Sequence, residues 1–200
     1  MECVIHDLIH YKNTMEEKKR VVIGLLGETG SGKDTVARYL KTRYNAHLLR
    51  FADPIKETLS LYFERFSKDD QQWLAMLLKE RFGKDILGKA LKPHIDGAEG
   101  IVSINGLRFP EDLDFVREFT PSYILYVTAP QKLRWERAHK RGEKTDDGQD
   151  FEHFQKMELV PTEVHIPEIG AKADFTIVND QGLDELLAAT DAVMEQILKS

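Results

Sequence analysis

Residues 21–35 of this chain read Val21-Val22-Ile23-Gly24-Leu25-Leu26-Gly27-Glu28-Thr29-Gly30-Ser31-Gly32-Lys33-Asp34-Thr35. The run from 21 to 26 is continuously apolar, which is typical of a strand buried on both faces of a parallel sheet. After a glycine-rich turn, Val36, Ala37 and Leu40 recur at the spacing of one helix face. The stretch therefore predicts a buried strand, a tight turn and a helix, in that order.

The turn between this strand and helix fits the pattern G-x-x-x-x-G-K, in which glycines let successive backbone N–H groups point at one anion. The helix N-terminus adds partial positive charge, and Lys33 adds a full charge for the β- and γ-phosphates. The alternative, a glycine-rich turn without a ligand, is disfavoured by the flanking strand and helix. We therefore predict that ATP binds here, through Gly27, Thr29, Gly30, Ser31, Gly32, Lys33, Asp34 and Thr35.

The residue after the lysine departs from the usual pattern. A Ser or Thr hydroxyl ordinarily ligates Mg²⁺ at this position, and here it is replaced by Asp34. Asp34 either binds Mg²⁺, directly or through a metal-bound water, or only stabilises the first helical turn. Asn105 ends a neighbouring predicted strand, where related sites carry a Mg²⁺-organising acid. We hypothesise that Asp34 supplies the charge that Asn105 lacks, while the Asn105 amide accepts a hydrogen bond from a metal-bound water.

Strands and helices alternate along the rest of the chain, and this alternation predicts a three-layer α/β/α sandwich with a mainly parallel sheet. Further strands are predicted at 47–51, 101–104, 123–127 and 175–178, and helices after Asp53 and at 71–82, 111–119, 131–140, 151–159 and 183–197. Residues 83–100 are rich in glycine and lysine, and we expect a flexible loop there.

Arg108 follows the strand at 101–104, in the crevice where α/β sheets bind ligands. A guanidinium there can hold a phosphate with two parallel hydrogen bonds. The alternative is a surface arginine that pairs with Glu111 or Asp112.

Basic residues are frequent between 131 and 144, namely Lys132, Arg134, Arg137, Lys140, Arg141 and Lys144. The arginines are three and four residues apart, so one helix face presents them together. The polar segment that follows is suited to a lid, which predicts that Arg137 and Arg141 stabilise charge on the transferred phosphoryl group. The alternative is a solvated helix face.

Asp53 stands before Pro54, where it either caps a helix or faces the acceptor. A monophosphate acceptor arrives as an anion, whereas a sugar hydroxyl must lose a proton to a carboxylate. We expect Asp53→Asn to leave the turnover of a monophosphate nearly intact and to lower the turnover of a hydroxyl acceptor by several powers of ten. Steady-state kinetics with both kinds of acceptor test this, and a large loss with the monophosphate contradicts it.

The composition limits the partners that we expect. Lys and Arg total 28 against 34 Asp and Glu, a net charge of -6 that disfavours nucleic acid and anionic membranes as partners. Cys3 is the single cysteine, so no internal disulfide forms and a reducing cytosol is suitable. The longest apolar run is too short to span a bilayer, and Glu2 and Asp7 are unlike the start of a secretory signal. We predict a cytoplasmic protein in which residues 21–200 form one domain. The sequence does not indicate an oligomeric state.

Taken together, these residues resemble the P-loop nucleoside and nucleotide kinase superfamily, in the branch of dephospho-CoA kinases and deoxynucleoside monophosphate kinases. The sequences Gly-Lys-Asp-Thr at 32–35 and Phe-Ala-Asp-Pro-Ile-Lys-Glu at 51–57 resemble the monophosphate kinases. Asn-Gly-Leu-Arg at 105–108 is similar to an Asp-Gly-x-Arg element of archaeal relatives. The stretch 173–179 resembles the segment before the last helix of dephospho-CoA kinases, which implies that Asn179 lies near the donor adenine.

The resemblance implies a five-stranded parallel sheet, a helical acceptor-binding insert at 53–100 and a lid at 137–155, after an extension at 1–20. It implies phosphotransfer from ATP with Mg²⁺ to a nucleotide-like small molecule, a (deoxy)nucleoside monophosphate before dephospho-CoA. Arg108 then holds the acceptor, and helices around Tyr62, Phe63 and Trp73 wall its pocket. A rival class is a P-loop regulatory module that binds or slowly hydrolyses nucleotide, which the neutral Asn105 favours.

Overall fold

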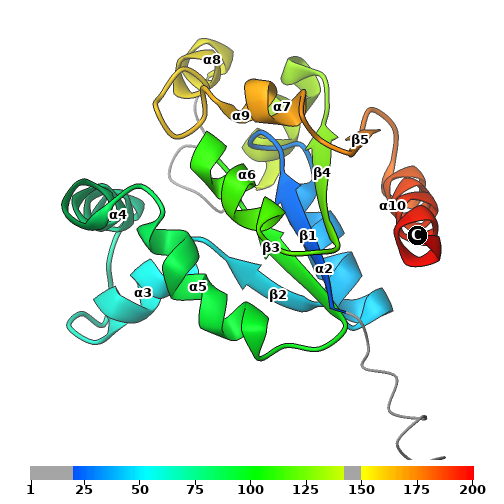
Figure 1. The fold of residues 1–200 in the computed structure, drawn as a ribbon. Coiled ribbons are helices and arrows are strands. Elements are labelled where there is room, and N and C mark those ends of the chain that lie inside the picture. The colour runs from blue at the N-terminus through cyan, green and yellow to red at the C-terminus, as the bar shows by residue number, and fades with distance from the viewer. Residues whose placement is uncertain (1–19, 142–149) are drawn as a thin grey trace, which may run out of the picture.

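The computed structural model describes residues 20–141 and 150–200 (Figure 1). Nearly all of the predicted extension at 1–20, and the middle of the predicted lid, lie outside these residues. Five parallel strands form one sheet in the order β2-β3-β1-β4-β5. They are β1 (Val21–Leu26), β2 (His47–Arg50), β3 (Ile101–Asn105), β4 (Ser122–Thr128) and β5 (Phe175–Val178). The predicted five-stranded parallel sheet is confirmed.

The helices cover both faces of the sheet, as predicted for a three-layer α/β/α sandwich. They are α2 (Lys33–Tyr44), α3 (Asp53–Ser60), α4 (Lys68–Phe82), α5 (Ile86–Asp96), α6 (Pro110–Arg117), α7 (Gln131–Arg141), α8 (Phe151–Met157), α9 (Ile166–Gly170) and α10 (Leu183–Lys199). Side chains of α2 and α10 join one buried cluster, and those of α3, α5, α6 and α9 join another on the opposite face. Among the described helices, none is long and apolar enough to cross a membrane.

The central strand shows why the apolar run at 21–26 is continuous. Val22 and Leu26 pack into the cluster on the α5 and α6 side, whereas Ile23 and Leu25 pack into the cluster on the α2 side. All four side chains are 0% exposed. A strand between two helical layers needs apolar residues at every position, so a period of two is absent.

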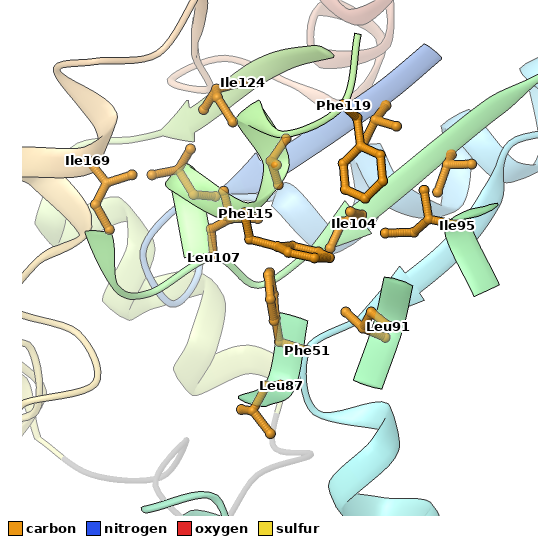
Figure 2. Close-up of a cluster of buried hydrophobic side chains, with 14 of the residues drawn as sticks. Phe51, Leu87, Leu91, Ile95, Ile104, Leu107, Phe115, Phe119, Ile124 and Ile169 are labelled. Atoms are coloured by element: carbon orange, nitrogen blue, oxygen red, sulfur yellow. The ribbon is translucent and has the colours of Figure 1, made fainter. Parts of the chain in front are cut away.

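The predicted loop at 83–100 is wrong, because most of it forms α5. Leu87, Leu91 and Ile95 recur every fourth residue and are buried beside Phe115 in the cluster (Figure 2). A Cβ at Gly88 would lie 2.7 Å from the Phe115 ring, so this glycine lets the helix approach α6 closely. The lysines of α5 are exposed, and their number in the sequence concealed an amphipathic helix.

Helix α3 also differs from its prediction at both ends. It begins after Ala52, and the Asp53 side chain makes no capping hydrogen bond, so the predicted N-cap at Asp53 is wrong. It ends at Ser60. Tyr62 and Phe63 recur at helical spacing after Ile55 and Leu59, but they lie beyond the end of the helix and are exposed. The predicted helix around these two aromatic residues is therefore wrong.

We expect Leu91→Ala to destabilise the protein by about 3 kcal/mol, because the substitution opens a cavity in the cluster that holds α5 to the sheet. His94→Ala, on the exposed side of the same helix, is the control and should cost less than about 0.5 kcal/mol. Urea unfolding of both variants measures the difference. Equal small losses would mean that α5 does not pack as a helix.

Candidate active site

The glycine-rich turn lies at the carboxyl edge of β1 and wraps tightly against two other segments. Gly30 and Gly32 have φ angles of +81° and +102°, which favour glycine. A Cβ at Gly30 would lie 2.3 Å from the carbonyl oxygen of Arg134 in α7. A Cβ at Gly32 would lie 2.4 Å from Nδ2 of Asn179, which follows β5. The loop conformation therefore depends on these glycines and on both neighbouring segments.

A cavity of about 500 Å³ opens beside this loop at the N-terminus of α2; we call it the donor cavity. Its lining includes every residue predicted to bind ATP except Gly27 and Ser31, which are buried behind it. The lining residues are Thr29, Gly30, Gly32, Lys33, Asp34, Thr35, Arg38, Arg137, Ala138, Asn179, Gln181, Gly182, Leu183 and Leu186. The structure thus brings the loop and Asn179 together from distant parts of the chain.

Asn179 connects the loop to α7. Its Nδ2 donates to the backbone oxygen of Ser31 over 2.8 Å. The Arg137 guanidinium donates to the Asn179 backbone oxygen over 2.9 Å and to that of Gln181 over 3.3 Å. Arg137 therefore lies in the wall of the donor cavity, and its part in phosphoryl transfer stays a prediction.

Two arginines of α7, Arg134 and Arg137, contact different segments and do not form the shared face that their spacing predicts. Arg134 is buried, forms an ion pair with Glu158 and donates to the Ala129 backbone oxygen over 2.8 Å. Arg137 instead points to the segment after β5. The Arg141 side chain lies outside the described part of the chain, as do residues 142–149. Arg134 thus holds α7 to α8, a role that the sequence pattern did not distinguish.

Asp34 and Asn105 meet as the sequence suggests. Asn105 Nδ2 donates to Asp34 Oδ1 over 2.7 Å, and Lys33 Nζ lies 4.0 Å from Asp34 Oδ2. Asn105 is buried, and its Oδ1 has no hydrogen-bond partner. Mg²⁺ in kinase sites is held by one or two carboxylates together with waters and phosphates, so one carboxylate and an unpaired oxygen fit this ion. Elsewhere in the described residues, no cluster of three His, Cys, Asp or Glu side chains offers a metal site.

We expect Asp34→Ala to raise the Mg²⁺ concentration for half-maximal activity by about tenfold, because the site loses its carboxylate. A Mg²⁺ titration at fixed ATP measures this. Asp184→Ala is the control, since Asp184 is an exposed acid in the first turn of α10. If both variants lose only thermal stability and keep the same Mg²⁺ dependence, Asp34 serves the helix alone.

Glu28, within the loop, contacts the neighbouring strand β4. The Tyr126 hydroxyl donates to the Glu28 carboxylate, and Thr128 Oγ1 donates to it over 3.3 Å. Burial, together with the bond to Glu28, raises the pKa of Tyr126 to about 12. Tyr126 therefore remains a protonated donor at neutral pH and fixes the loop to β4.

A second cavity of about 200 Å³ lies between α3, α4, the segment after β3 and residues 162–163; we call it the acceptor cavity. Its walls are mostly apolar, with polar groups that include two cations and two glutamines. The lining residues are Phe51, Ala52, Ile55, Gln71, Gln72, Ala75, Met76, Lys79, Leu87, Gly106, Arg108, Phe109, Asp112, Thr162 and Glu163. The helical insert thus forms a cavity at the same edge of the sheet as the loop.

Arg108 lines this cavity, and its partners differ from those weighed in the sequence. Its guanidinium forms an ion pair with Glu163 and donates to the Thr162 backbone oxygen over 3.2 Å. Asp112 instead accepts from the backbone N–H groups of Arg108 and Phe109, at 2.9 and 3.1 Å, and holds the start of α6. Burial raises the pKa of Asp112 above its usual range.

Lys79 is a cavity residue that the sequence prediction missed. Its Nζ lies 3.4 Å from Glu111 Oε1 and 3.7 Å from the centre of the Phe109 ring. Lys79 shares one face of α4 with Gln72, Ala75 and other lining residues. The helical spacing of Gln72 and Lys79 could have indicated a cavity wall in the sequence. A helix face exposed to solvent has the same pattern, so the spacing does not distinguish the two.

Two other predicted elements of the acceptor pocket lie elsewhere. Tyr62, Phe63 and Trp73 are 77%, 56% and 64% exposed and do not line the cavity, so the prediction that they wall it is wrong. Asp53 is half-buried outside the lining, and it has no hydrogen bond or ion pair within the described residues. Phe51, Met76 and Phe109 supply the large apolar walls instead.

Comparisons with known proteins agree with this geometry. The family model described as deoxynucleotide monophosphate kinase matches residues 21–89, which include the loop and most of the insert. A UPF0200 protein of Sulfurisphaera tokodaii is 29% identical over 177 residues, with 88% of this chain and 97% of that protein covered. A UPF0200 protein of Methanocaldococcus jannaschii is 25% identical over 183 residues, with coverage of 90% and 92%.

Solved structures of shikimate kinases share the fold. That of Bacteroides thetaiotaomicron has a TM-score of 0.62 at 14% identity and covers 88% of this chain and 98% of its own. That of Aquifex aeolicus has a TM-score of 0.55 at 17% identity, with coverage of 87% and 96%. A parallel sheet with a phosphate-binding loop after its central strand defines the class of P-loop proteins. Within that class, the chain has the fold of these kinases, and its residues 21–89 are similar to the deoxynucleotide monophosphate kinase family.

Proposed function

We propose that this protein transfers the γ-phosphoryl group of ATP, with Mg²⁺, to a (deoxy)nucleoside monophosphate. The observation that carries the proposal is the pair of cavities at one edge of the sheet, one beside the phosphate loop and one around Arg108. The family-model match over the loop and insert supports the same substrate class.

In the donor cavity, the loop amides and Lys33 hold the β- and γ-phosphates, and the adenine lies toward Asn179 and α10. Asp34 and Asn105 would hold Mg²⁺ or its waters, and the ion would supply positive charge to these phosphates. Asn179 holds the loop in place through its hydrogen bond to the Ser31 backbone oxygen. ATP therefore meets backbone N–H groups that are already oriented toward its phosphates.

In the acceptor cavity, Arg108 binds the monophosphate in place of Glu163. The aromatic side chains of Phe51 and Phe109 provide apolar surface for a base, and the amides of Gln71 and Gln72 can read its polar edge. An anionic phosphate is already deprotonated, so this acceptor needs no carboxylate base. The position of Asp53 outside the cavity lining agrees with that requirement.

A regulatory nucleotide-binding module needs only the donor cavity. The presence of the second cavity, with Arg108 in its lining, therefore favours a kinase with a phosphorylated acceptor. Coupled assays of ATP consumption test the proposal with deoxynucleoside monophosphates, nucleoside monophosphates, dephospho-CoA and shikimate. We expect at least one monophosphate to stimulate ATP consumption and to form a diphosphate. Stimulation by dephospho-CoA or shikimate alone would assign another acceptor, and ATP binding without any stimulation would favour the module.

A further inference from the structure

Arg50 is the last residue of β2, at the carboxyl edge of the sheet. The strand register pairs it with Asn105 of β3. Paired residues of neighbouring parallel strands point to the same face, about 4.8 Å apart across the sheet. Arg50 and Asn105 are therefore side-chain neighbours on the face covered by α2.

Both residues carry a buried polar atom without a partner. Arg50 Nε is a buried donor with no acceptor, and Asn105 Oδ1 is a buried acceptor with no donor. Within the described part of the chain, the Arg50 guanidinium takes part in no hydrogen bond or ion pair. Buried polar groups are almost always paired in folded proteins, so the unpaired Arg50 N–H indicates a missing acceptor, such as a phosphate oxygen. The Asn105 oxygen is an acceptor itself and remains placed for Mg²⁺ or a metal-bound water.

Arg50 and Asn105 line neither cavity, but both adjoin residues that do. Asn105 binds Asp34, which lines the donor cavity. The residues that directly follow Arg50 and Asn105, namely Phe51 and Gly106, line the acceptor cavity. Under the proposed function, the phosphoryl group passes from the donor cavity to the acceptor cavity near the ends of β2 and β3, where Arg50 and Asn105 lie.

We propose that Arg50 binds a non-bridging oxygen of the phosphoryl group during transfer, an inference that rests on the proposed function. An oxygen of the acceptor monophosphate forms a bond to the γ-phosphorus, and the bond between that phosphorus and the β–γ bridging oxygen breaks. ADP leaves with the electron pair, and the acceptor becomes a diphosphate, with no proton transferred. The permanent positive charge of Arg50 stabilises the transition state most, because negative charge then spreads over the oxygens of the transferred phosphoryl group.

The absence of a partner separates this role from a structural one. An arginine that holds the fold has carboxylate or carbonyl partners, as Arg134 has in Glu158 and Ala129. Arg50 has none among the described residues, so removing its charge takes away no interaction that the fold uses. Activity and stability therefore respond differently to its substitution.

The test compares Arg50→Met, which keeps the length and apolar stem, with Arg50→Lys, which keeps the charge. We expect Arg50→Met to lower kcat about 100-fold or more, with little change in the KM for ATP and an unchanged or higher Tm. Arg50→Lys should recover part of the rate, because an ammonium supplies the charge without the planar fork. Arg81→Ala, an exposed arginine in α4, is the control and should behave as wild type.

A binding readout separates this inference from the proposed function. The probe is a bisubstrate compound in which adenosine and a second nucleoside are joined by five phosphates, so that it spans both cavities. Calorimetry should show at least about tenfold weaker binding of this compound to Arg50→Met, with ATP binding unchanged. That result supports the inference even if no acceptor stimulates the wild type, an outcome that refutes the proposed function alone.

The inference is overturned if Arg50→Met keeps kcat and bisubstrate affinity within about threefold of wild type. A marked loss of Tm in Arg50→Met and Arg50→Lys alike would overturn it too, because that result reveals a structural role. So would a wild type that binds the bisubstrate compound no more tightly than ATP.

Discussion

Lys33→Ala should lower acceptor-dependent ATP consumption by roughly 1000-fold and weaken ATP binding to the point where saturation is not reached. Lys33 is buried at the start of α2 in the wall of the donor cavity, and under the proposed function its ammonium binds the β- and γ-phosphates with little competing water. No other lysine lines that cavity, so within the described residues nothing of the same kind replaces it.

Calorimetric ATP titration and a coupled assay measure the two effects. Lys41→Ala is the matched control, because Lys41 is exposed on the same helix and should leave both quantities unchanged. A Lys33→Ala variant that keeps its Tm and still binds ATP with wild-type affinity would refute the assignment of this cavity to the donor.

Arg108→Ala should reduce kcat/KM for the acceptor by about 100-fold or more, while the KM for ATP changes little. Arg108 lines the acceptor cavity, and the charge-assisted bonds that it now makes to Glu163 are those that a phosphate would take. Steady-state kinetics with the acceptor varied at saturating ATP measure the loss.

Glu163→Gln distinguishes phosphate binding from a structural ion pair. If Arg108 only fixes residues 162–163, removing the charge of Glu163 should impair the enzyme as Arg108→Ala does. If Arg108 holds the acceptor, the same change removes a competing carboxylate, and the acceptor KM should stay the same or fall. Parallel losses in both variants would contradict the acceptor role.

The central part of the fold was predictable because it depends on local patterns. The apolar run at 21–26 and the glycines after it specify a buried strand and a phosphate-binding turn without reference to the rest of the chain. The strand that ends at Asn105 was equally clear, and the topology then brought Asn105 to Asp34. The carboxyl ends of parallel strands share one edge, which is why that meeting could be anticipated.

The acceptor cavity was not predictable in the same way. Its walls combine Phe51, Lys79, Phe109 and Glu163, which come from four segments that the sequence separates widely. Tyr62, Phe63 and Trp73 are of the same residue types as true cavity walls. The end of α3 leaves the first two exposed, and Trp73 is exposed on the surface of α4. The residue types alone do not distinguish a cavity wall from an exposed surface, because that difference depends on where each helix ends and which way it faces.

By itself, the sequence determined the phosphate loop and the alternation of strands and helices. These features follow from short-range geometry, since the periods of strand and helix and the freedom of glycine act within a few residues. Tertiary structure alone decided that Arg108 faces Glu163, that Arg134 is buried and that Arg50 has no partner within the described chain. The physical reason is that a charged side chain takes its partner from whichever segment packs against it, and that choice is made only when the layers assemble.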